Sequence, residues 1–551
     1  MTSTHPDTVI VNAGIRATDP DITSLAITRG RITALDRRSL AESAGPGTRV
    51  IDAGGATVLP GFTDAHVHPL AAGVQLLSCD LSRRPHDLEA YRTAVRAYAD
   101  SHPEHEWING TGWYGDTFPG GLPTRRILDE LVPDRPAVFL SHDAHGVWAN
   151  TRALERAKID DSTPDPTNGR INRDANGSAT GFLAERAGDL VTDLLPPIDD
   201  AFAEKALLAA QAHLHAMGVT GWQDACVGPL FGMPDPLPLY RRLAADGRLT
   251  ARVVGALWWF ADKGLGQLDS LEERRASSGV GRFRATSVKV MQDGMCENCT
   301  AAMLQPYAGD VHHGAGTGMS FIDPEELKEI CRELDRRSFQ IHLHAVGDRA
   351  VRECLDALEA ARDAGLGHDN RHQIAHLDVV DRADIPRFAE LGVIANIQAL
   401  WARRDKEITE RKLPLLGAER ESRHFPFQEL KATGARLAMG SDWPVTDPNP
   451  LWAIYTAVTR LGPRQDPHSV GDGVFTRPLE AQHALGLDVA LDAYTSGSAY
   501  ANHMEDAVGT LTVGHRADLV VLDRPLTDVE EVAAARPVLT LVDGETVHGE
   551  L

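Results

Sequence analysis

The chain lacks the features of a secreted or membrane-spanning protein. It has only six cysteines among 551 residues, too few for a disulfide framework, so a reducing compartment is expected. No apolar run approaches the roughly 18 residues that a membrane span requires. The first residues, MTSTHPDTVIVNAGIR, lack the basic and apolar regions of a secretory leader. We therefore expect a cytoplasmic protein with no membrane partner.

Basic residues are also scarce. There are 55 Lys and Arg against 78 Asp and Glu, and the formal net charge is −23. Without a basic block, the surface does not favour nucleic acid, and a small-molecule ligand or substrate is the expected partner. The length allows one large barrel with additions, or several domains. The sequence leaves the oligomeric state open, with a homodimer among the alternatives.

Both ends of the chain have the pattern of short strands. Residues 1–60 alternate apolar and polar positions between glycine turns, and 509–549 repeat that pattern in GTLTVGHRADLVVLDR and PVLTLVDGETVHG. Neither end is long enough for a core of its own. We therefore predict one composite β-sandwich domain built from residues 1–60 and 502–551.

Between these ends, apolar strands alternate with helical segments, which indicates a parallel α/β architecture. We predict a (β/α)8 TIM-like barrel over residues 61–501. Its helices include 199–217, 324–337, 347–363 and 381–391. About 150 residues separate the first two strands, so we assign 75–200 to an insertion subdomain over the active-site face. The predicted strands are 62–68, 219–224, 252–258, 286–292, 339–344, 372–377, 393–398 and 436–442.

Polar residues recur on one face of these strands. In a barrel strand, alternate residues face the interior, so a polar residue flanked by apolar neighbours is expected inside. Each such residue has an ordinary explanation taken singly, for example as a satisfied core histidine or a helix cap. Together they predict a cluster at the carboxyl ends of the strands: Asp64, His66, His68, Lys289, His342, His344, His376 and Asp442.

A metal site explains this cluster. Imidazoles with a carboxylate suit Zn²⁺ and tolerate Fe, Mn or Co. Lys289 is unusual, because a buried unpaired ammonium is costly and repels cations. Carbamylation by carbon dioxide would convert it into an anionic ligand able to bridge two metals.

Five motifs resemble the metal-dependent amidohydrolase superfamily, specifically its amidohydrolase 3 (YtcJ-like) branch: GFTDAHVHP, VKVMQDG, IHLHAVGDRA, HQIAHLD and MGSDWPV. The resemblance extends over almost the whole chain. It implies one or two divalent metals and a carbamylated Lys289. The metal-site residues that it implies are His66, His68, Lys289, His344, His376 and Asp442.

The resemblance also implies a reaction. A metal-activated water would attack the carbonyl of a non-peptide amide, with Asp442 as the catalytic proton acceptor and donor. His66, His68 and Asp442 would hold one metal, and His344 and His376 a second. N-substituted formamides are one substrate class of this branch.

Four further residues are candidates for substrate binding. His145, in HDAHGVWAN, matches a motif of the branch, with a loop histidine capping a helix as the alternative. Trp113 could form an apolar pocket wall or pack in a core, and Glu185 could reach the site or lie on a solvated helix face. Asp293 follows the lysine strand. Beyond it, Cys296 and Cys299 form a C-x-x-C pair that we interpret as incidental thiols.

Three alternatives to amide hydrolysis remain open. A deaminase, or an ester or lactone hydrolase, could use the same metal scaffold. A non-catalytic barrel that binds a ligand and regulates is the third, although the complete set of metal-ligand residues argues against it.

Overall fold

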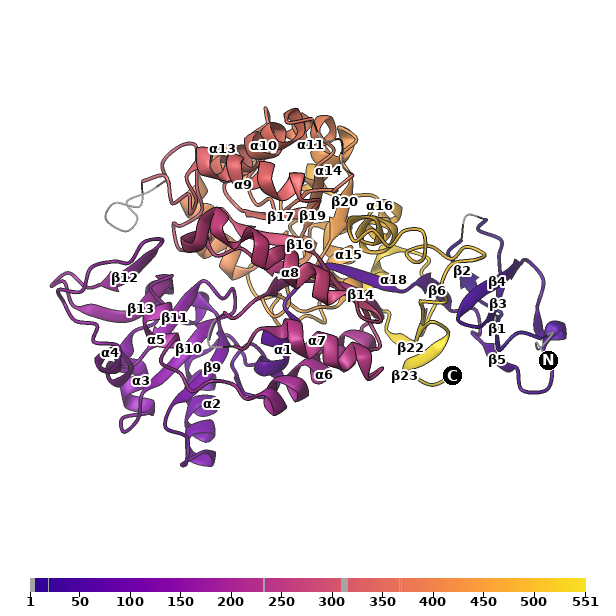
Figure 1. Cartoon of the computed structure of the whole chain (residues 1–551). Coiled ribbons are helices and arrows are strands. Elements are labelled where there is room, and N and C mark those ends of the chain that lie inside the picture. The colour runs from indigo at the N-terminus through magenta and orange to yellow at the C-terminus, as the bar shows by residue number, and fades with distance from the viewer. Residues whose placement is uncertain (1–4, 18, 231–232, 309–315, 366, 368) are drawn as a thin grey trace.

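The central element is an eight-stranded parallel sheet that curls into a barrel (Figure 1). The computed structural model describes residues 5–17, 19–230, 233–308, 316–365, 367 and 369–551. Each strand pairs in parallel with the next barrel strand along the chain, which confirms the predicted TIM-like barrel. The strands are β7 (Phe62–Val67), β14 (Val219–Val227), β15 (Arg252–Trp258), β16 (Phe283–Met291), β17 (Gln340–Ala345), β18 (Gln373–His376), β19 (Ile394–Ile397) and β20 (Leu437–Met439).

Helices surround this barrel. The apolar positions of α9 recur at helical spacing, with Leu327, Ile330 and Leu334 buried, so one face packs inward. The expected helix over 381–391 is shorter, because α11 begins at Ile385 with a proline in its first turn. The principal helices are α1 (Pro69–Leu76), α6 (Asp200–Ala216), α7 (Pro236–Ala245), α8 (Leu268–Ser278), α9 (Pro324–Arg336), α10 (Asp348–Asp363), α11 (Ile385–Leu391), α14 (Phe427–Ala432), α15 (Pro450–Thr459) and α16 (Leu487–Asp492).

The barrel interior is polar below the mouth. Gln223, Ser287, Gln340, Gln373 and Asn396 are all buried. Gln223 lies on β14, and the other four lie on the neighbouring strands β16, β17, β18 and β19. Layers of branched apolar side chains usually fill this space, whereas here amides and the Ser287 hydroxyl occupy it and hydrogen-bond to one another.

A second sheet lies within the segment predicted as an insertion. Its six strands run in the order β12-β13-β11-β10-β9-β8. Two apolar clusters pack on it, one of them around Phe139, Trp148 and Phe182. The strands are β8 (Cys79–Asp80), β9 (Ile108–Trp113), β10 (Ala137–Ser141), β11 (Gly146–Ala149), β12 (Gly169–Arg173) and β13 (Ala179–Glu185), with helices α2 (Leu88–Ser101), α3 (Arg125–Leu131), α4 (Thr151–Arg156) and α5 (Asp189–Thr192).

The two ends of the chain meet in a pair of sheets on the other side of the barrel (Figure 1). One sheet has the order β4-β3-β1-β5; the other, β2-β6-β21-β22-β23, joins strands from both ends. A common apolar cluster includes Ile10, Leu25, Val521 and Leu541. The strands are β1 (Thr8–Val11), β2 (Gly14–Ile15), β3 (Ser24–Thr28), β4 (Arg31–Asp36), β5 (Arg49–Asp52), β6 (Thr57–Pro60), β21 (Leu519–Leu522), β22 (Pro537–Val542) and β23 (Glu545–Gly549).

Within the described ranges, no helix combines the length and the apolar character needed to cross a membrane.

Candidate metal centre

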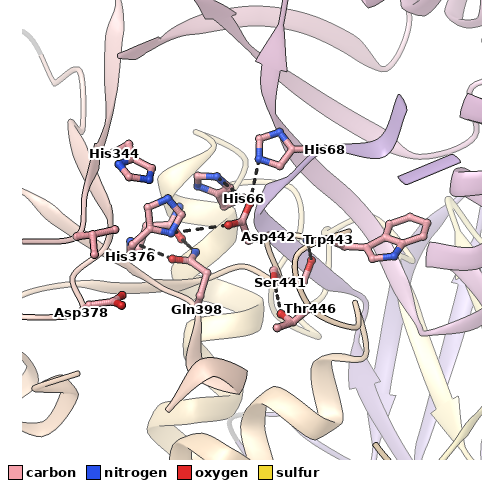
Figure 2. Close-up of polar contacts among 12 residues, drawn as sticks. His66, His68, His344, His376, Asp378, Gln398, Ser441, Asp442, Trp443 and Thr446 are labelled. Atoms are coloured by element: carbon pink, nitrogen blue, oxygen red, sulfur yellow. Dashed lines mark hydrogen bonds and ion pairs between the residues drawn. The ribbon is translucent and has the colours of Figure 1, made fainter. Parts of the chain in front are cut away.

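Three buried side chains converge at the carboxyl ends of the barrel strands. His66 comes from β7, His376 ends β18, and Asp442 follows β20. One potential ligand atom from each lies within 4.8 Å of the others. Figure 2 shows the three side chains pointing toward one another. Two imidazoles and a carboxylate at this separation form a candidate site for one metal ion.

Two further histidines border this group. His68 Nε2 lies 2.9 Å from Asp442 Oδ1, and its side chain is 23% exposed at the mouth of the barrel. The His344 ring lies 4.4 Å from the His376 ring, centroid to centroid. The structure therefore brings together all four histidines and the aspartate that the sequence analysis assigned to metal binding, while their individual roles stay predictions.

Lys289 also lies in this cluster. Its Nζ is 3.3 Å from Nε2 of His66, inside the barrel. Burial lowers the pKa of Lys289 to about 8, against an opposing effect of Asp442. In a fraction of the molecules, the Lys289 side chain is therefore an uncharged amine near neutral pH. This is the form that reacts with carbon dioxide. The predicted carbamate stays a prediction.

Three of these histidines are held in the neutral form, which is the form that binds metals. Burial lowers the pKa of His66, His344 and His376 well below 6.5, and nearby Lys289 and imidazoles lower it further. A neutral imidazole offers a lone pair to a metal ion. Both ring nitrogens of His376 are buried and have no hydrogen-bond partner in the described part of the chain. A buried unpaired nitrogen is costly, so this donor set fits a metal ion.

The position of His376 is set by neighbours in the segment that follows β19. Its backbone has a φ of 82°, a strained value for a residue with a side chain. Its N–H donates to Oε1 of Gln398 at 2.9 Å. The imidazole stacks on Trp401 with 5.2 Å between ring centroids and 7° between ring planes. These contacts hold the ring toward Asp442 despite the strained backbone.

The first and last barrel strands meet at this site. The Asp442 N–H donates to the His66 carbonyl at 2.7 Å. Asp64, whose role the sequence left open, accepts hydrogen bonds from the N–H groups of His66 and Ser441. Gly440 allows the close approach, because a Cβ there would lie 2.5 Å from the His66 nitrogen. The strand junction therefore fixes the two ligand candidates relative to each other.

The insertion contributes a charged pair. His145 Nδ1 lies 2.7 Å from Oε2 of Glu185, because β11 and β13 pair with Gly146 opposite Ala184. Burial alone lowers the pKa of His145, but the Glu185 carboxylate, helped by Asp143 and Asp442, raises it to about 9. Glu185 ends a strand and is nearly buried, so it does not lie on a solvated helix face. The His145 ring is 5.6 Å from that of His344.

Asp293 and Trp113 make internal contacts. Asp293 accepts hydrogen bonds from three backbone N–H groups and lies 3.1 Å from Nδ1 of His344. Trp113 packs edge-on against Phe118 and Phe182, and its Nε1 donates to a backbone carbonyl. Their predicted contact with substrate stays a prediction.

The C-x-x-C pair lies in the loop after β16. Burial raises the thiol pKa of Cys296 and Cys299, and a protonated thiol is a poor nucleophile and ligand.

Known proteins share this architecture. The model of the amidohydrolase family matches residues 49–548. "Putative amidohydrolase YtcJ" of Bacillus subtilis (strain 168) is 28% identical over 507 residues, covering 91% of each chain. N-substituted formamide deformylase of Arthrobacter pascens is 27% identical over 569 residues, covering 98% of this chain and 97% of its own.

A solved structure agrees. The chain resembles an uncharacterized metal-dependent hydrolase from Pyrococcus furiosus with a TM-score of 0.68 and 25% identity, covering 95% of this chain and 99% of the other. The resemblance inferred from the five motifs is thereby confirmed. The chain belongs to the amidohydrolase family of metal-dependent hydrolases.

Proposed function

We propose that this protein hydrolyses a non-peptide C–N bond of a small molecule, with N-substituted formamides as the leading substrate class. The observation that carries the proposal is the convergence of His66, His376 and Asp442 within 4.8 Å at the barrel mouth. The similarity to N-substituted formamide deformylase along nearly the whole of both chains supports the substrate class.

We propose Zn²⁺ as the metal, with Fe, Mn or Co as alternatives. His66, His376 and Asp442 would hold one ion. His68, His344 and a carbamylated Lys289 would complete the site or hold a second ion. The chemistry that a divalent metal supplies in such a site is polarisation of the scissile carbonyl and a lowered pKa of water.

Asp442 is the proposed proton carrier. Its carboxylate lies at the barrel mouth, 2.9 Å from the partly exposed His68. It would take a proton from the attacking water as the new C–O bond forms. It would then deliver that proton to the nitrogen as the C–N bond breaks, so that a carboxylic acid and an amine leave.

The candidate substrate-binding residues would act by different routes. His145, held by Glu185 at 2.7 Å, would donate a hydrogen bond to the substrate carbonyl from its other ring nitrogen. Glu185 keeps that ring charged. Asp293 would act through His344, which it orients. Trp113 would act indirectly, through its packing against Phe118 and Phe182 in the predicted insertion.

Metal analysis combined with an amide panel tests the proposal. Purified protein should contain at least one divalent metal per chain and release an amine and formate from an N-substituted formamide. Dialysis against a chelator should abolish turnover, and Zn²⁺ should restore it. Ammonia as the product would instead indicate a deaminase, and turnover of esters or lactones alone would indicate the other hydrolase class. A metal-free protein without turnover would favour a ligand-binding regulator.

We also propose that the two terminal sheets form one composite β-sandwich domain of residues 1–60 and 502–551. The common apolar cluster supports this assignment. Six free cysteines support a reducing, cytoplasmic location. A homodimer stays a prediction that light scattering can test.

A further inference from the structure

A chain of buried side chains runs beneath the metal centre, across the barrel interior. It connects His66 to the amides of neighbouring strands through hydrogen bonds of 2.6–2.9 Å. An amide has distinct donor and acceptor ends, so the direction of each bond can be worked out from its anchors. The members are His66, His342, Gln223, Gln340, Gln373 and Asn396.

Gln340 is the first anchor. Its Nε2 lies 2.9 Å from the carbonyl oxygen of Arg371 and 2.6 Å from that of Ala501. Carbonyl oxygens can only accept. The amide nitrogen of Gln340 must therefore face them, and its Oε1 must point into the barrel as an acceptor.

The orientation of Gln223 follows. Oε1 of Gln340 lies 2.8 Å from the Gln223 amide and can only accept, so the nearer atom of that amide is the donor Nε2. Oε1 of Gln223 then lies 2.8 Å from Nδ1 of His342.

A second anchor gives the same orientation. Nδ2 of Asn396 donates to the carbonyl of Ala65 and to Oε1 of Gln373. Nε2 of Gln373 therefore points the other way and donates to Oε1 of Gln223 at 2.6 Å. Both anchors make Oε1 of Gln223 an acceptor.

The proton positions on the two histidines follow. Because Oε1 of Gln223 can only accept, Nδ1 of His342 carries a hydrogen. Among the described residues, the ring nitrogens of His342 contact an amide and an imidazole, and no carboxylate bonds to them to balance a buried charge. His342 is therefore neutral, its Nε2 has a lone pair, and this lone pair accepts from Nδ1 of His66 at 2.8 Å.

We propose that His342 and Gln223 are positioning residues that fix the tautomer of His66, so that its unprotonated Nε2 faces the metal centre. This inference rests on the proposed metal site. Which ring nitrogen binds a metal is commonly set by the hydrogen bond at the other nitrogen.

A contact on the opposite side of the ring agrees. Nε2 of His66 lies 3.3 Å from Nζ of Lys289. Where Lys289 is a free ammonium, it has only hydrogens to donate, and the contact then matches a lone pair on Nε2. The amide network therefore carries the assignment of the tautomer, and the contact with a charged lysine is compatible with it.

Zn²⁺ affinity, measured on metal-free protein by competition with a chromophoric chelator, tests the proposal. His342→Leu and Gln223→Leu should each weaken Zn²⁺ binding by about 10–100-fold, the usual effect of losing such a partner. His342→Gln should retain most of the affinity, because its amide can accept from His66 and donate to Gln223. Gln211→Leu is the matched control, since Gln211 is a buried amide of α6 that bonds outside the barrel interior.

The tautomer itself can be read without metal. Histidine ¹⁵N NMR of metal-free protein, assigned with His66→Asn, should show the hydrogen of His66 on Nδ1. A hydrogen on Nε2, or a His342→Leu variant that binds Zn²⁺ as tightly as wild type, would overturn the proposal. Wild-type protein that binds no Zn²⁺ would overturn the metal centre and the purpose of the positioning residues together, whereas the other two outcomes refute the positioning role alone.

Discussion

The ion pair between His145 and Glu185 should make stability depend on pH in a defined direction. The pKa of His145 is raised from 6.5 to about 9 in the folded protein. A group with a raised pKa contributes stability that is fully present below its unfolded pKa and is lost as pH rises through its folded pKa. The contribution of His145 is therefore complete below about pH 6.5 and disappears by about pH 9.

The size of the effect can be worked out. A rise in pKa from 6.5 to about 9 corresponds to about 3 kcal/mol. For 551 residues, the unfolding entropy is about 1.2 kcal/mol per degree. Glu185→Gln removes the carboxylate that stabilises the buried His145 imidazolium, so this substitution should lower the Tm by about 2–3 °C near pH 6.5. That difference should shrink steadily toward pH 9.

The assay is differential scanning calorimetry of metal-free wild type and Glu185→Gln between pH 6 and 10, since a bound cation would itself repel the imidazolium. Thr300→Val is the matched control, because Thr300 donates the other hydrogen bond to Glu185 without carrying charge. Its Tm difference from wild type should stay constant across this range. A Glu185→Gln difference that is constant or grows with pH would refute the charge assignment.

Three other variants test the site and the packing. Asp442→Asn removes the proton acceptor, so initial rates should give a kcat/KM lower by about 10²–10⁴-fold; an unchanged value would exclude Asp442 from the chemistry. Lys412→Met leaves the buried Asp378 without its cation, so urea unfolding should show a loss of about 3–5 kcal/mol. The double variant with Asp378→Asn should recover part of it, and a fully stable Lys412→Met would contradict the reasoning. Gly73→Ala places a methyl group 2.0 Å from a backbone oxygen of α6, whereas Gly266→Ala meets nothing within 4 Å; only the first should lower the Tm, by the equivalent of about 1–3 kcal/mol, and equal Tm values would count against the packing.

The order of the barrel strands could be predicted from the sequence because each has a clear apolar pattern bounded by helices. Strand parity predicted the inward side of His66, His344 and His376, since alternation is a local property of the backbone. It could not reveal the strained backbone at His376, which depends on Gln398 and Trp401 from other elements.

The partners of the insertion could not be predicted in the same way. His145 and Glu185 are 40 positions apart, and they meet because of the register between β11 and β13. Pattern alone does not define register between strands that no tight turn connects. The buried amides were missed for a related reason: Gln223 and Gln340 look like ordinary polar strand residues until the barrel closes around them.

The junction between β7 and β20 has a consequence for synthesis of the protein. The proposed metal site takes His66 from the first barrel strand and Asp442 from just after the last, and a backbone hydrogen bond from the Asp442 N–H to the His66 carbonyl joins the two segments. A ribosome-bound chain therefore exposes His66 and His68 long before it makes Asp442. The proposed ligand set is complete only after Asp442 has left the ribosome, so the proposed centre could hold a metal ion stably only late in synthesis.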